Sequence, residues 1–219
     1  MRPSAPATRR IVAYVSFHGT GVVGCTTTGQ YAVDATTGVL SPLSPPTAMT
    51  GTYPGGSAVN PSTAFAFVTN IGDNTVLQYS IATNGALTAL APATVAAGSQ
   101  PDFIAIDPTN KYAYVANFTP NLSGIGGPGP ASISQYLLQK SGQLMLMPMT
   151  PATVAAGPGC GWLSFDPFGV YLYCANIGDT TTPGSISEYS IGANGALTLI
   201  GTVSGGRSTF AIATTYVGG

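Results

Sequence analysis

The sequence predicts an all-β protein built from repeated units of four short antiparallel strands. The heptapeptide Pro92-Ala-Thr-Val-Ala-Ala-Gly98 recurs without change at positions 151–157. Two further motifs recur once in each unit, and no stretch shows the period of a helix. A Gly-x-Leu tripeptide begins at Gly38, Gly85, Gly142 and Gly195, and an aromatic-rich segment occupies residues 13–16, 67–70, 114–117 and 173–176. Repeats of this kind, with four strands each, are the signature of a β-propeller blade.

The strands are expected in the same order in each unit. The first is small and apolar, as at residues 103–106, and it ends in an Asx-Pro turn. The second carries the aromatic-rich segment. The third alternates apolar and polar residues, as at 76–81 and 185–191, and a glycine turn leads to the fourth, as at 86–90. Such alternation is typical of half-buried strands.

The chain is long enough for one domain with four blades. Residues 1–10 are expected to form a flexible segment, and residues 11–219 a single propeller domain. Residues 209–213 align with residues 102–106 and are expected to be an extra first strand, which completes the first blade and removes its open edge. The predicted blade units are about 11–56 together with 207–219, 57–101, 102–159 and 160–206.

Two closed arrangements fit this pattern. A single chain could close as a four-bladed ring with a narrow axis filled by side chains. Alternatively, two chains could each supply half of an eight-bladed ring, with the closing strand paired between chains. The second arrangement, a homodimer, agrees with the common twofold symmetry of protein assemblies. It is slightly favoured because the blades resemble those of wider rings, but the sequence does not choose between the two.

The composition excludes several classes of function. Only 6% of the 219 residues are charged and the formal net charge is −1, so the basic stripe that nucleic-acid binding requires is absent. No window approaches the length of a membrane-spanning helix, and no apolar stretch near the N-terminus has the form of a signal peptide. The location is not predicted, although low charge with many Thr, Ser, Gly and Pro residues points weakly to an extracytoplasmic one.

Three motifs together resemble those of a known family. They are Pro-x-x-Ile-x-x-Asp-Pro at residues 101–108, Tyr-Val-x-Asn at 114–117 and Thr-Gly-x-Leu at 37–40. The pattern is similar to that of the YVTN-repeat, lactonase-type β-propellers, which include 6-phosphogluconolactonase and the cycloisomerase that lactonises carboxymuconate. The resemblance implies a propeller whose His, Arg and carboxylate groups gather near one mouth of the central channel. Family members typically have seven blades, whereas this chain has room for four.

The candidate catalytic pair is His18 with Arg207. The predicted closure places these two residues on neighbouring strands of the composite blade, at the face where first strands begin and second strands end. Arginine can hold a carboxylate or phosphate with two hydrogen bonds, and neutral histidine can activate water or move a proton. The alternative is that His18 occupies a turn and Arg207 solvates a glycine-rich loop.

Other side chains at the same face are candidates for substrate binding. The repeated Asn-Ile-Gly-Asp segments at 70–73 and 176–179 resemble oxygen ligands for calcium. Their repetition in successive blades instead favours Asx turns that satisfy local backbone groups, so we predict neither a metal nor another cofactor. The predicted substrate-binding residues are Asn70, Asp102, Asn117, Trp162 and Asn176.

The three cysteines do not form a metal pattern. Cys160 and Cys174 flank one predicted hairpin, where a cross-strand disulfide is geometrically demanding. We therefore expect buried free thiols, which behave as small apolar side chains.

Two functions remain open on the sequence alone. The first is a lactonase-like propeller that binds, and in an enzyme would hydrolyse, a small lactone or anionic ligand at the top face of the ring. The alternative is a non-catalytic propeller that acts as a surface, adhesion or scaffolding module, which the scarcity of carboxylates and histidines favours. Fold alone cannot separate an enzyme from a binding module.

Overall fold

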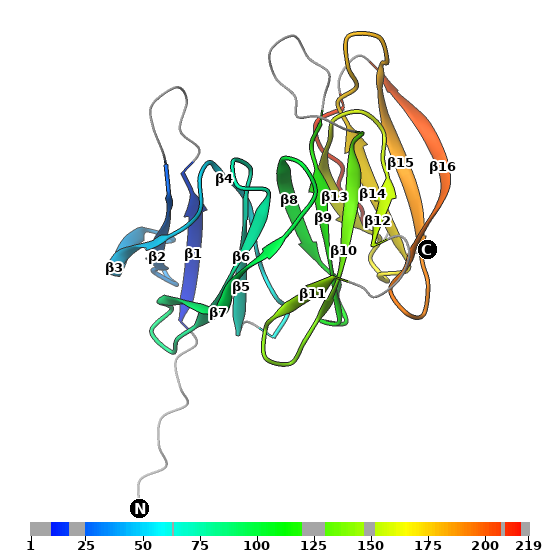
Figure 1. Ribbon diagram of the computed structural model, residues 1–219. Coiled ribbons are helices and arrows are strands. Elements are labelled where there is room, and N and C mark those ends of the chain that lie inside the picture. Colours follow the sequence, from blue (N-terminus) through cyan, green and yellow to red (C-terminus); the bar gives the residue numbers. More distant parts are fainter. Residues whose placement is uncertain are drawn as a thin grey trace, which may run out of the picture.

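The computed structural model describes residues 10–17, 25–62, 64–119, 130–146, 152–206 and 209–215. Over these ranges the chain forms sixteen strands and no helix, which confirms the predicted all-β class. The strands make four antiparallel sheets that follow one another along the chain. The sheets stand side by side in a curved row, so the fold is propeller-like (Figure 1).

We number the sheets first to fourth in chain order. The first sheet contains β1 (Ile11–Ser16), β2 (Thr27–Val33) and β3 (Leu40–Met49). The second contains β4 (Pro54–Val59), β5 (Phe65–Asn70), β6 (Thr75–Ile81) and β7 (Leu87–Ala96). The third contains β8 (Pro101–Ile106), β9 (Tyr112–Asn117) and β10 (Ser132–Leu138), with β11 (Leu144–Leu146) and β12 (Thr153–Ala155) both paired to β10. The fourth contains β13 (Cys160–Phe165), β14 (Tyr171–Asn176), β15 (Gly184–Ile191) and β16 (Leu197–Gly206).

The Asx-Pro turns hold the hairpin between the first two strands of a sheet. The side-chain oxygen of Asn60 accepts hydrogen bonds from the amides of Ala64 (3.1 Å) and Phe65 (2.9 Å). Asp166 does the same for Val170 and Tyr171, both at 2.6 Å. Short polar side chains that bind the backbone in this way favour turns over strands, so the hairpins begin where the sequence predicts them.

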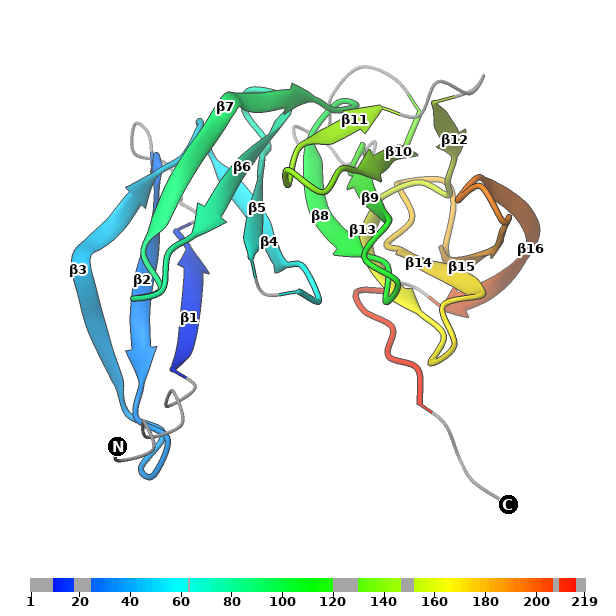
Figure 2. The ribbon, with the colours of Figure 1, turned by 90° about the horizontal axis from the view of Figure 1, so that it is seen from below.

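The core lies between the sheets. Apolar side chains of facing sheets interlock at each boundary, and large residues such as Phe67, Ile104, Tyr136 and Leu163 are almost completely buried there. Strands β4, β8 and β13 contact one another in turn, and Figure 2 shows them with β1 on the concave side of the row. We call β4, β8 and β13 the inner strands.

The closure within one chain that the sequence predicts is not formed by the residues described. The first sheet has three strands, and residues 209–215 form no strand. This segment instead runs beside the fourth sheet, where the Thr214 hydroxyl donates a hydrogen bond to the Phe165 carbonyl. The physical reason is the width of the arc: the first and fourth sheets lie at its opposite ends, so β1 keeps one edge unpaired (Figure 2).

The expectation of free thiols at Cys160 and Cys174 is wrong. The two residues form a disulfide with an S–S distance of 1.99 Å and a Cα–Cα distance of 5.8 Å. Cys160 is paired in register with Asn176, while Cys174 faces Leu163. The pairing shifts between Cys160 and Trp162, where Gly161 is the extra residue, and this shift brings the two sulfurs together across the hairpin.

Candidate functional site

The inner strands share an irregularity near the point where each begins. The pairing with the following strand shifts between Pro54 and Ser57 in β4, between Pro101 and Phe103 in β8, and between Cys160 and Trp162 in β13. Such bulges insert a residue that does not pair, and they commonly redirect a side chain next to functional sites. In β4 the glycines Gly55 and Gly56 together stand opposite Thr69, and the inserted residues of β8 and β13 are Asp102 and Gly161. Asp102 is therefore the inserted residue that carries a side chain.

The Asp102 carboxylate lies over Gly161 of the neighbouring sheet. A Cβ atom built on Gly161 would stand 3.4 Å from Asp102 Oδ2 and 3.2 Å from the ring of Phe118. A side chain at this position of β13 would press on Phe118, whereas its contact with the carboxylate would be an ordinary one. The disulfide at Cys160 fixes β13 to β14 immediately before that glycine.

Two aromatic side chains stack where β8 and β13 meet, each next in sequence to a residue of the bulges. Phe103, which follows Asp102, stacks on Trp162 with ring centroids 4.3 Å apart and an interplanar angle of 29°. Trp162 remains 40% exposed, so part of its indole surface is free to contact another molecule. An exposed aromatic face can pack against the apolar side of a ring, and a carboxylate accepts hydrogen bonds from hydroxyl groups. We call Asp102, Phe103, Phe118, Gly161 and Trp162 the bulge site.

The three predicted asparagines lie at the ends of β5, β9 and β14 and are completely buried. Asn70 accepts a hydrogen bond from the Gly51 amide (3.0 Å) and donates one to the Thr75 hydroxyl (3.0 Å). The other two amides contact pairs of serine hydroxyls on the next strand: Asn117 with Ser132 (3.0 Å) and Ser134 (2.9 Å), and Asn176 with Ser185 (3.0 Å) and Ser187 (2.9 Å). This gives the asparagines a structural role at this face, and ligand contact by them stays a prediction.

The repeated aspartates hold turns. Asp73 accepts a hydrogen bond from the Thr52 amide (2.7 Å) and another from the Thr52 hydroxyl, and the hydroxyl is the main cause of a pKa below the ordinary value. Asp179 binds the amides of Thr181 (2.8 Å) and Thr182 (2.6 Å), and the Thr181 amide chiefly lowers the pKa of Asp179. Within the described ranges, no three acidic, histidine or cysteine side chains converge as a metal site requires.

The predicted catalytic pair lies outside the described residues. His18 follows β1 and Phe17, and Arg207 follows β16. Because β1 and β16 belong to the first and fourth sheets, at opposite ends of the arc, the composite blade that would make the pair neighbours is not formed within one chain by the strands described (Figure 2). The pairing of His18 with Arg207 stays a prediction.

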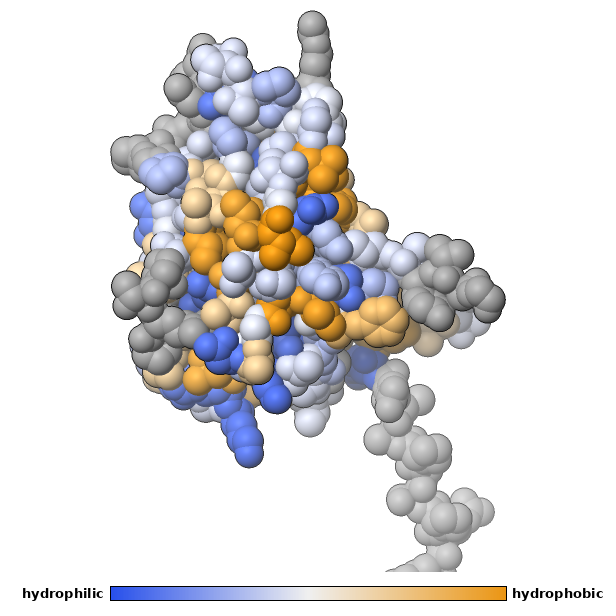
Figure 3. Space-filling view, turned by 90° about the vertical axis from the view of Figure 1, so that its right-hand side faces the viewer, coloured by the Kyte–Doolittle hydropathy of each residue, from blue (hydrophilic) through white to orange (hydrophobic). Residues whose placement is uncertain are grey.

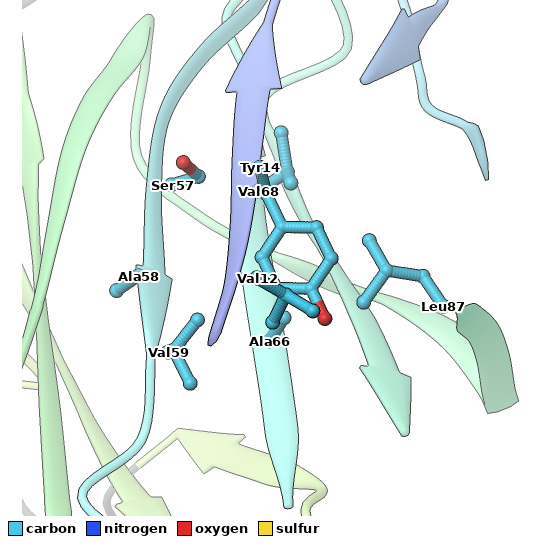
Figure 4. A pocket seen from close by; sticks show the side chains of 8 residues that line it. All are labelled: Val12, Tyr14, Ser57, Ala58, Val59, Ala66, Val68 and Leu87. Atoms are coloured by element: carbon cyan, nitrogen blue, oxygen red, sulfur yellow. The ribbon is translucent and has the colours of Figure 1, made fainter. Parts of the chain in front are cut away.

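Two hollows lie between the first and second sheets, away from the bulge site. The smaller, of about 220 Å³, is lined mainly by apolar side chains, among them Val12, Val59, Val68 and Leu87 (Figure 4). Its one phenol, that of Tyr14, donates a hydrogen bond to the Gly85 carbonyl at 2.7 Å. A larger hollow of about 770 Å³ adjoins it and has Arg10 on its lining. Neither hollow includes a predicted site residue.

The sequence did not point to three members of the bulge site, namely Phe103, Phe118 and Gly161. Their signal is weak but readable. Each predicted first strand has a small or acidic residue one position after Pro54, Pro101 or Cys160. Glycine within a strand often marks a bulge or a close approach of another chain segment.

Comparison with known proteins supports the fold class. No family model matches the sequence, and no curated protein sequence matches it either. A candidate 6-phosphogluconolactonase from Bacteroides fragilis NCTC 9343 superimposes with a TM-score of 0.68 at 18% identity, covering 84% of this chain and 50% of that one. One from Bacteroides uniformis ATCC 8492 gives 0.64 at 20% identity, with 81% and 51% covered. A functionally unknown protein from Desulfotomaculum acetoxidans DSM 771 gives 0.67 at 17% identity, with 95% and 62% covered.

At these identities the likeness is one of fold. The chain shares its propeller-like architecture with these three proteins, and it spans about half the length of the two candidate 6-phosphogluconolactonases. No helix in the described part of the chain is long and apolar enough to cross a membrane.

Proposed function

We propose that this protein binds a small hydroxylated lactone at the bulge site and hydrolyses it to the hydroxy acid. The observation that carries the proposal is the position of Asp102, the one inserted residue of the inner strands with a side chain: its carboxylate lies over Gly161, the residue before the partly exposed Trp162. The architecture shared with two candidate 6-phosphogluconolactonases supports the choice of ligand class.

The ligand ring packs on Trp162 and its hydroxyl groups donate hydrogen bonds to the Asp102 carboxylate. Burial of apolar ring surface on an aromatic face and hydrogen bonds to an ionised acceptor are both favourable. The buried amides of Asn70, Asn117 and Asn176 hold the strand ends at this face, so they position the site whether or not they contact the ligand.

His18 and Arg207 act on the ester group. Water adds to the carbonyl carbon while His18 takes its proton, the ring C–O bond breaks, and His18 returns the proton to the departing alkoxide. Arg207 holds the carboxylate of the product or a phosphate on the ligand through paired hydrogen bonds. The product is an open-chain hydroxy acid.

A second copy of the chain completes the ring around the mouth of the central channel. Residues 11–219 form one propeller domain of four blades, and two such domains make an eight-bladed ring. In that ring, residues 209–213 pair with the unpaired edge of β1 in the other chain, which brings Arg207 of one chain near His18 of the other. Extended segments commonly add to an open sheet edge in this way.

The test is hydrolysis of sugar and aliphatic lactones by the purified full chain, measured as the amount of acid that is released. We expect turnover of hydroxylated lactones, and its loss in His18→Ala and Asp102→Asn. Asp73→Asn is the matched control, because this exposed aspartate lies in a turn and outside the proposed machinery. Turnover that survives His18→Ala would contradict the assigned mechanism, and turnover that survives Asp102→Asn would contradict the site.

A non-catalytic scaffolding module is the second candidate function. It is favoured by the apolar side chains exposed on the fourth sheet and the segment beside it, including Val170, Leu199, Ile200, Val203 and Phe210. Exposed apolar patches commonly mark assembly surfaces. No turnover and no lactone binding would overturn the proposed hydrolase and leave this alternative.

A further inference from the structure

One hydrogen bond recurs at every boundary between consecutive sheets. We call β3, β7, β11, β12 and β16, which lie at the other edge of each sheet, the outer strands. A glutamine side-chain oxygen on β2, β6 or β10 accepts the amide proton of the leucine that begins an outer strand (β7, β11 or β16) of the next sheet. The three bonds join Gln30 to Leu87 (2.6 Å), Gln78 to Leu144 (2.5 Å) and Gln135 to Leu197 (2.7 Å). All six side chains are buried, so each bond is made away from water and its loss would leave a buried polar group unpaired.

A second contact covers the glycine turn of the next sheet. A side chain on Gly85, Gly142 or Gly195 would collide with Val12, Phe65 or Tyr112 of the preceding sheet, respectively. Two tyrosines of the same strands, β1 and β9, also donate hydrogen bonds to these turns. The hydroxyls of Tyr14 and Tyr114 bind the carbonyls of Gly85 and Gly195, both at 2.7 Å.

A third contact runs in the opposite direction. A tyrosine next to the glutamine position donates its hydroxyl to a carbonyl at the end of the outer strand of the preceding sheet. These bonds join Tyr79 to Met49, Tyr136 to Ala96 (2.7 Å) and Tyr189 to Ala155 (2.7 Å). The same three contacts therefore join the first sheet to the second, the second to the third and the third to the fourth.

The strand register identifies the same positions at the two ends of the row. Glu188 faces Tyr173 in the fourth sheet, as Gln78 faces Phe67 and Gln135 faces Tyr114. Tyr171 then corresponds to Tyr112. Ser204 faces Ser185, as Ala155 faces Ser132 and Ala96 faces Thr75. In the first sheet, Gly38 lies in the corresponding glycine turn, Leu40 begins β3, and Tyr31 follows Gln30.

These end positions are open where their counterparts are covered. Leu40 is 49% exposed, whereas Leu87, Leu144 and Leu197 are 5–8% exposed. A Cβ on Gly38 would meet no atom within 4 Å. Tyr31 is half-buried, while Tyr79, Tyr136 and Tyr189 are fully buried. Among the residues described, no donor reaches the Glu188 carboxylate. The side of the molecule that bears the fourth sheet has hydrophobic residues gathered at its centre (Figure 3).

We infer that the fourth sheet of one copy docks on the first sheet of a second copy through this contact set. The Glu188 carboxylate accepts the amide proton of Leu40 of the partner subunit. The Tyr173 hydroxyl donates to the carbonyl of Gly38 of the partner subunit, and Tyr171 covers that glycine. In return, the hydroxyl of Tyr31 of the partner subunit donates to the Ser204 carbonyl. Two such joints, related by a twofold axis, close a ring of two chains.

Glu188 distinguishes this joint from those within the chain. Gln30 and Gln78 also donate their amide groups to the carbonyls of Pro45 (3.1 Å) and Pro92 (3.3 Å), whereas Glu188 faces Gly201 and has only acceptor atoms. It is the single glutamate of the chain. A carboxylate that accepts an amide proton makes a stronger hydrogen bond than a neutral amide oxygen does, which favours this position as the contact between subunits.

This inference rests on the two-chain ring proposed above, but it does not rest on lactone binding. The experiment is sedimentation of the full chain over a range of concentrations. We expect the wild type to form a particle of about 44 kDa, twice the 22.0 kDa of one chain. Glu188→Gln should remain dimeric because glutamine serves at the other boundaries. In Glu188→Lys, the lysine ammonium group would face the Leu40 amide, and both groups are donors. We therefore expect the dissociation constant of the dimer to rise about tenfold or more.

A matched set of variants locates the joint. Leu40→Asp alters the opposite side of the joint at an exposed position and should also dissociate the dimer. Lys140→Glu, an exposed charge reversal in the third sheet, should leave the dimer intact. Mixing Glu188→Lys with Leu40→Asp should restore a dimer with one intact joint, because each variant retains the side that the other lacks. Hydrogen exchange of residues 11–16 and of Leu40 should slow as the wild-type dimer forms.

Several results would overturn the inference. A dimer that Glu188→Lys and Leu40→Asp both leave intact would place the interface elsewhere. A mixture of these variants that stays monomeric would contradict a head-to-tail joint. A wild-type chain that is monomeric at every concentration would leave the two open faces to other occupants, such as further sheets of a longer chain. Because none of these readouts uses a lactone, failure here is distinguishable from failure of the proposed hydrolysis.

Discussion

Asp102 projects from a bulge whose counterparts in β4 and β13 have glycine, so one residue difference creates the acidic group of the bulge site. The register shift leaves only a weak signal in the sequence, a small or acidic residue near the start of the strand, because a strand with one inserted residue has nearly the same apolar pattern as a regular strand. Asp102 and Trp162 could be predicted at this face from strand order alone. Their contacts with Phe118 and Gly161 depend on how the third and fourth sheets meet.

Gly161→Ala tests whether the space above Gly161 is needed. The added methyl group would stand 3.2 Å from the Phe118 ring and in ordinary contact, at 3.4 Å, with Asp102 Oδ2, so we expect it to push on Phe118 and weaken lactone binding several-fold. Gly192→Ala, in an exposed turn, is the control. Calorimetric titration of both variants with one lactone measures the effect, and equal affinities would show that the packing of Phe118 against Gly161 does not matter for binding.

Asp73 tests the assigned turn role through acid stability. Its pKa is lowered in the folded state by the Thr52 hydroxyl and amide, so it stabilises the fold above its ordinary pKa of 3.8. That contribution is lost as the pH falls below 3.8 through the lower folded-state pKa. Asp73→Asn should therefore flatten the fall in the free energy of unfolding below this pH, as measured by urea titration. An unchanged acid profile would contradict the hydrogen bonds to Thr52.

Individual strands were largely predictable. The aromatic-rich segments at 67–70, 114–117 and 173–176 are the ends of β5, β9 and β14. The turn residues between strands act locally, which is why the sequence locates them well. The disulfide was missed because it depends on the shift at Gly161, and the strand expected at 209–213 requires a partner edge that one chain does not bring near.

The Cys160–Cys174 disulfide constrains β13 against β14 beside the bulge site. It closes a loop with a sequence separation of 14, for which a loss of about 3 kcal/mol in unfolding free energy is expected on removal. We predict this loss for the double variant Cys160→Ala/Cys174→Ala in a denaturant titration. Cys25→Ala is the control because Cys25 is a free cysteine. A double variant as stable as the control would contradict the disulfide.

At the scale of the whole molecule, the repeated tyrosines between sheets make the fold sensitive to alkali. Burial raises the pKa of Tyr79 and Tyr136 above the ordinary value of 10.0 and that of Tyr189 to about 12. The folded state therefore keeps these protons at a pH where the unfolded state releases them. Stability is fully present below pH 10 and falls as the pH rises through the folded-state values.

Alkaline unfolding should accordingly be steep between pH 10 and about 12, with tyrosinate absorbance rising together with the loss of near-ultraviolet circular dichroism. Tyr189→Phe removes one of these protons together with the hydroxyl that binds the Ala155 carbonyl. It should lower stability at neutral pH and make the alkaline profile shallower. Tyrosine titration at ordinary pH values in the intact fold would contradict the burial of these hydroxyls.

Lactone binding at the bulge site is measured most directly by the fluorescence of Trp162, the single tryptophan of the chain. The titrant is glucono-δ-lactone, with wild type, Asp102→Asn and Asp73→Asn compared under the same conditions. We predict a saturable change in the wild type and in Asp73→Asn, and a dissociation constant about tenfold or more higher in Asp102→Asn. An emission that does not respond in the wild type, or responds equally in all three proteins, would contradict a lactone site at Asp102 and Trp162.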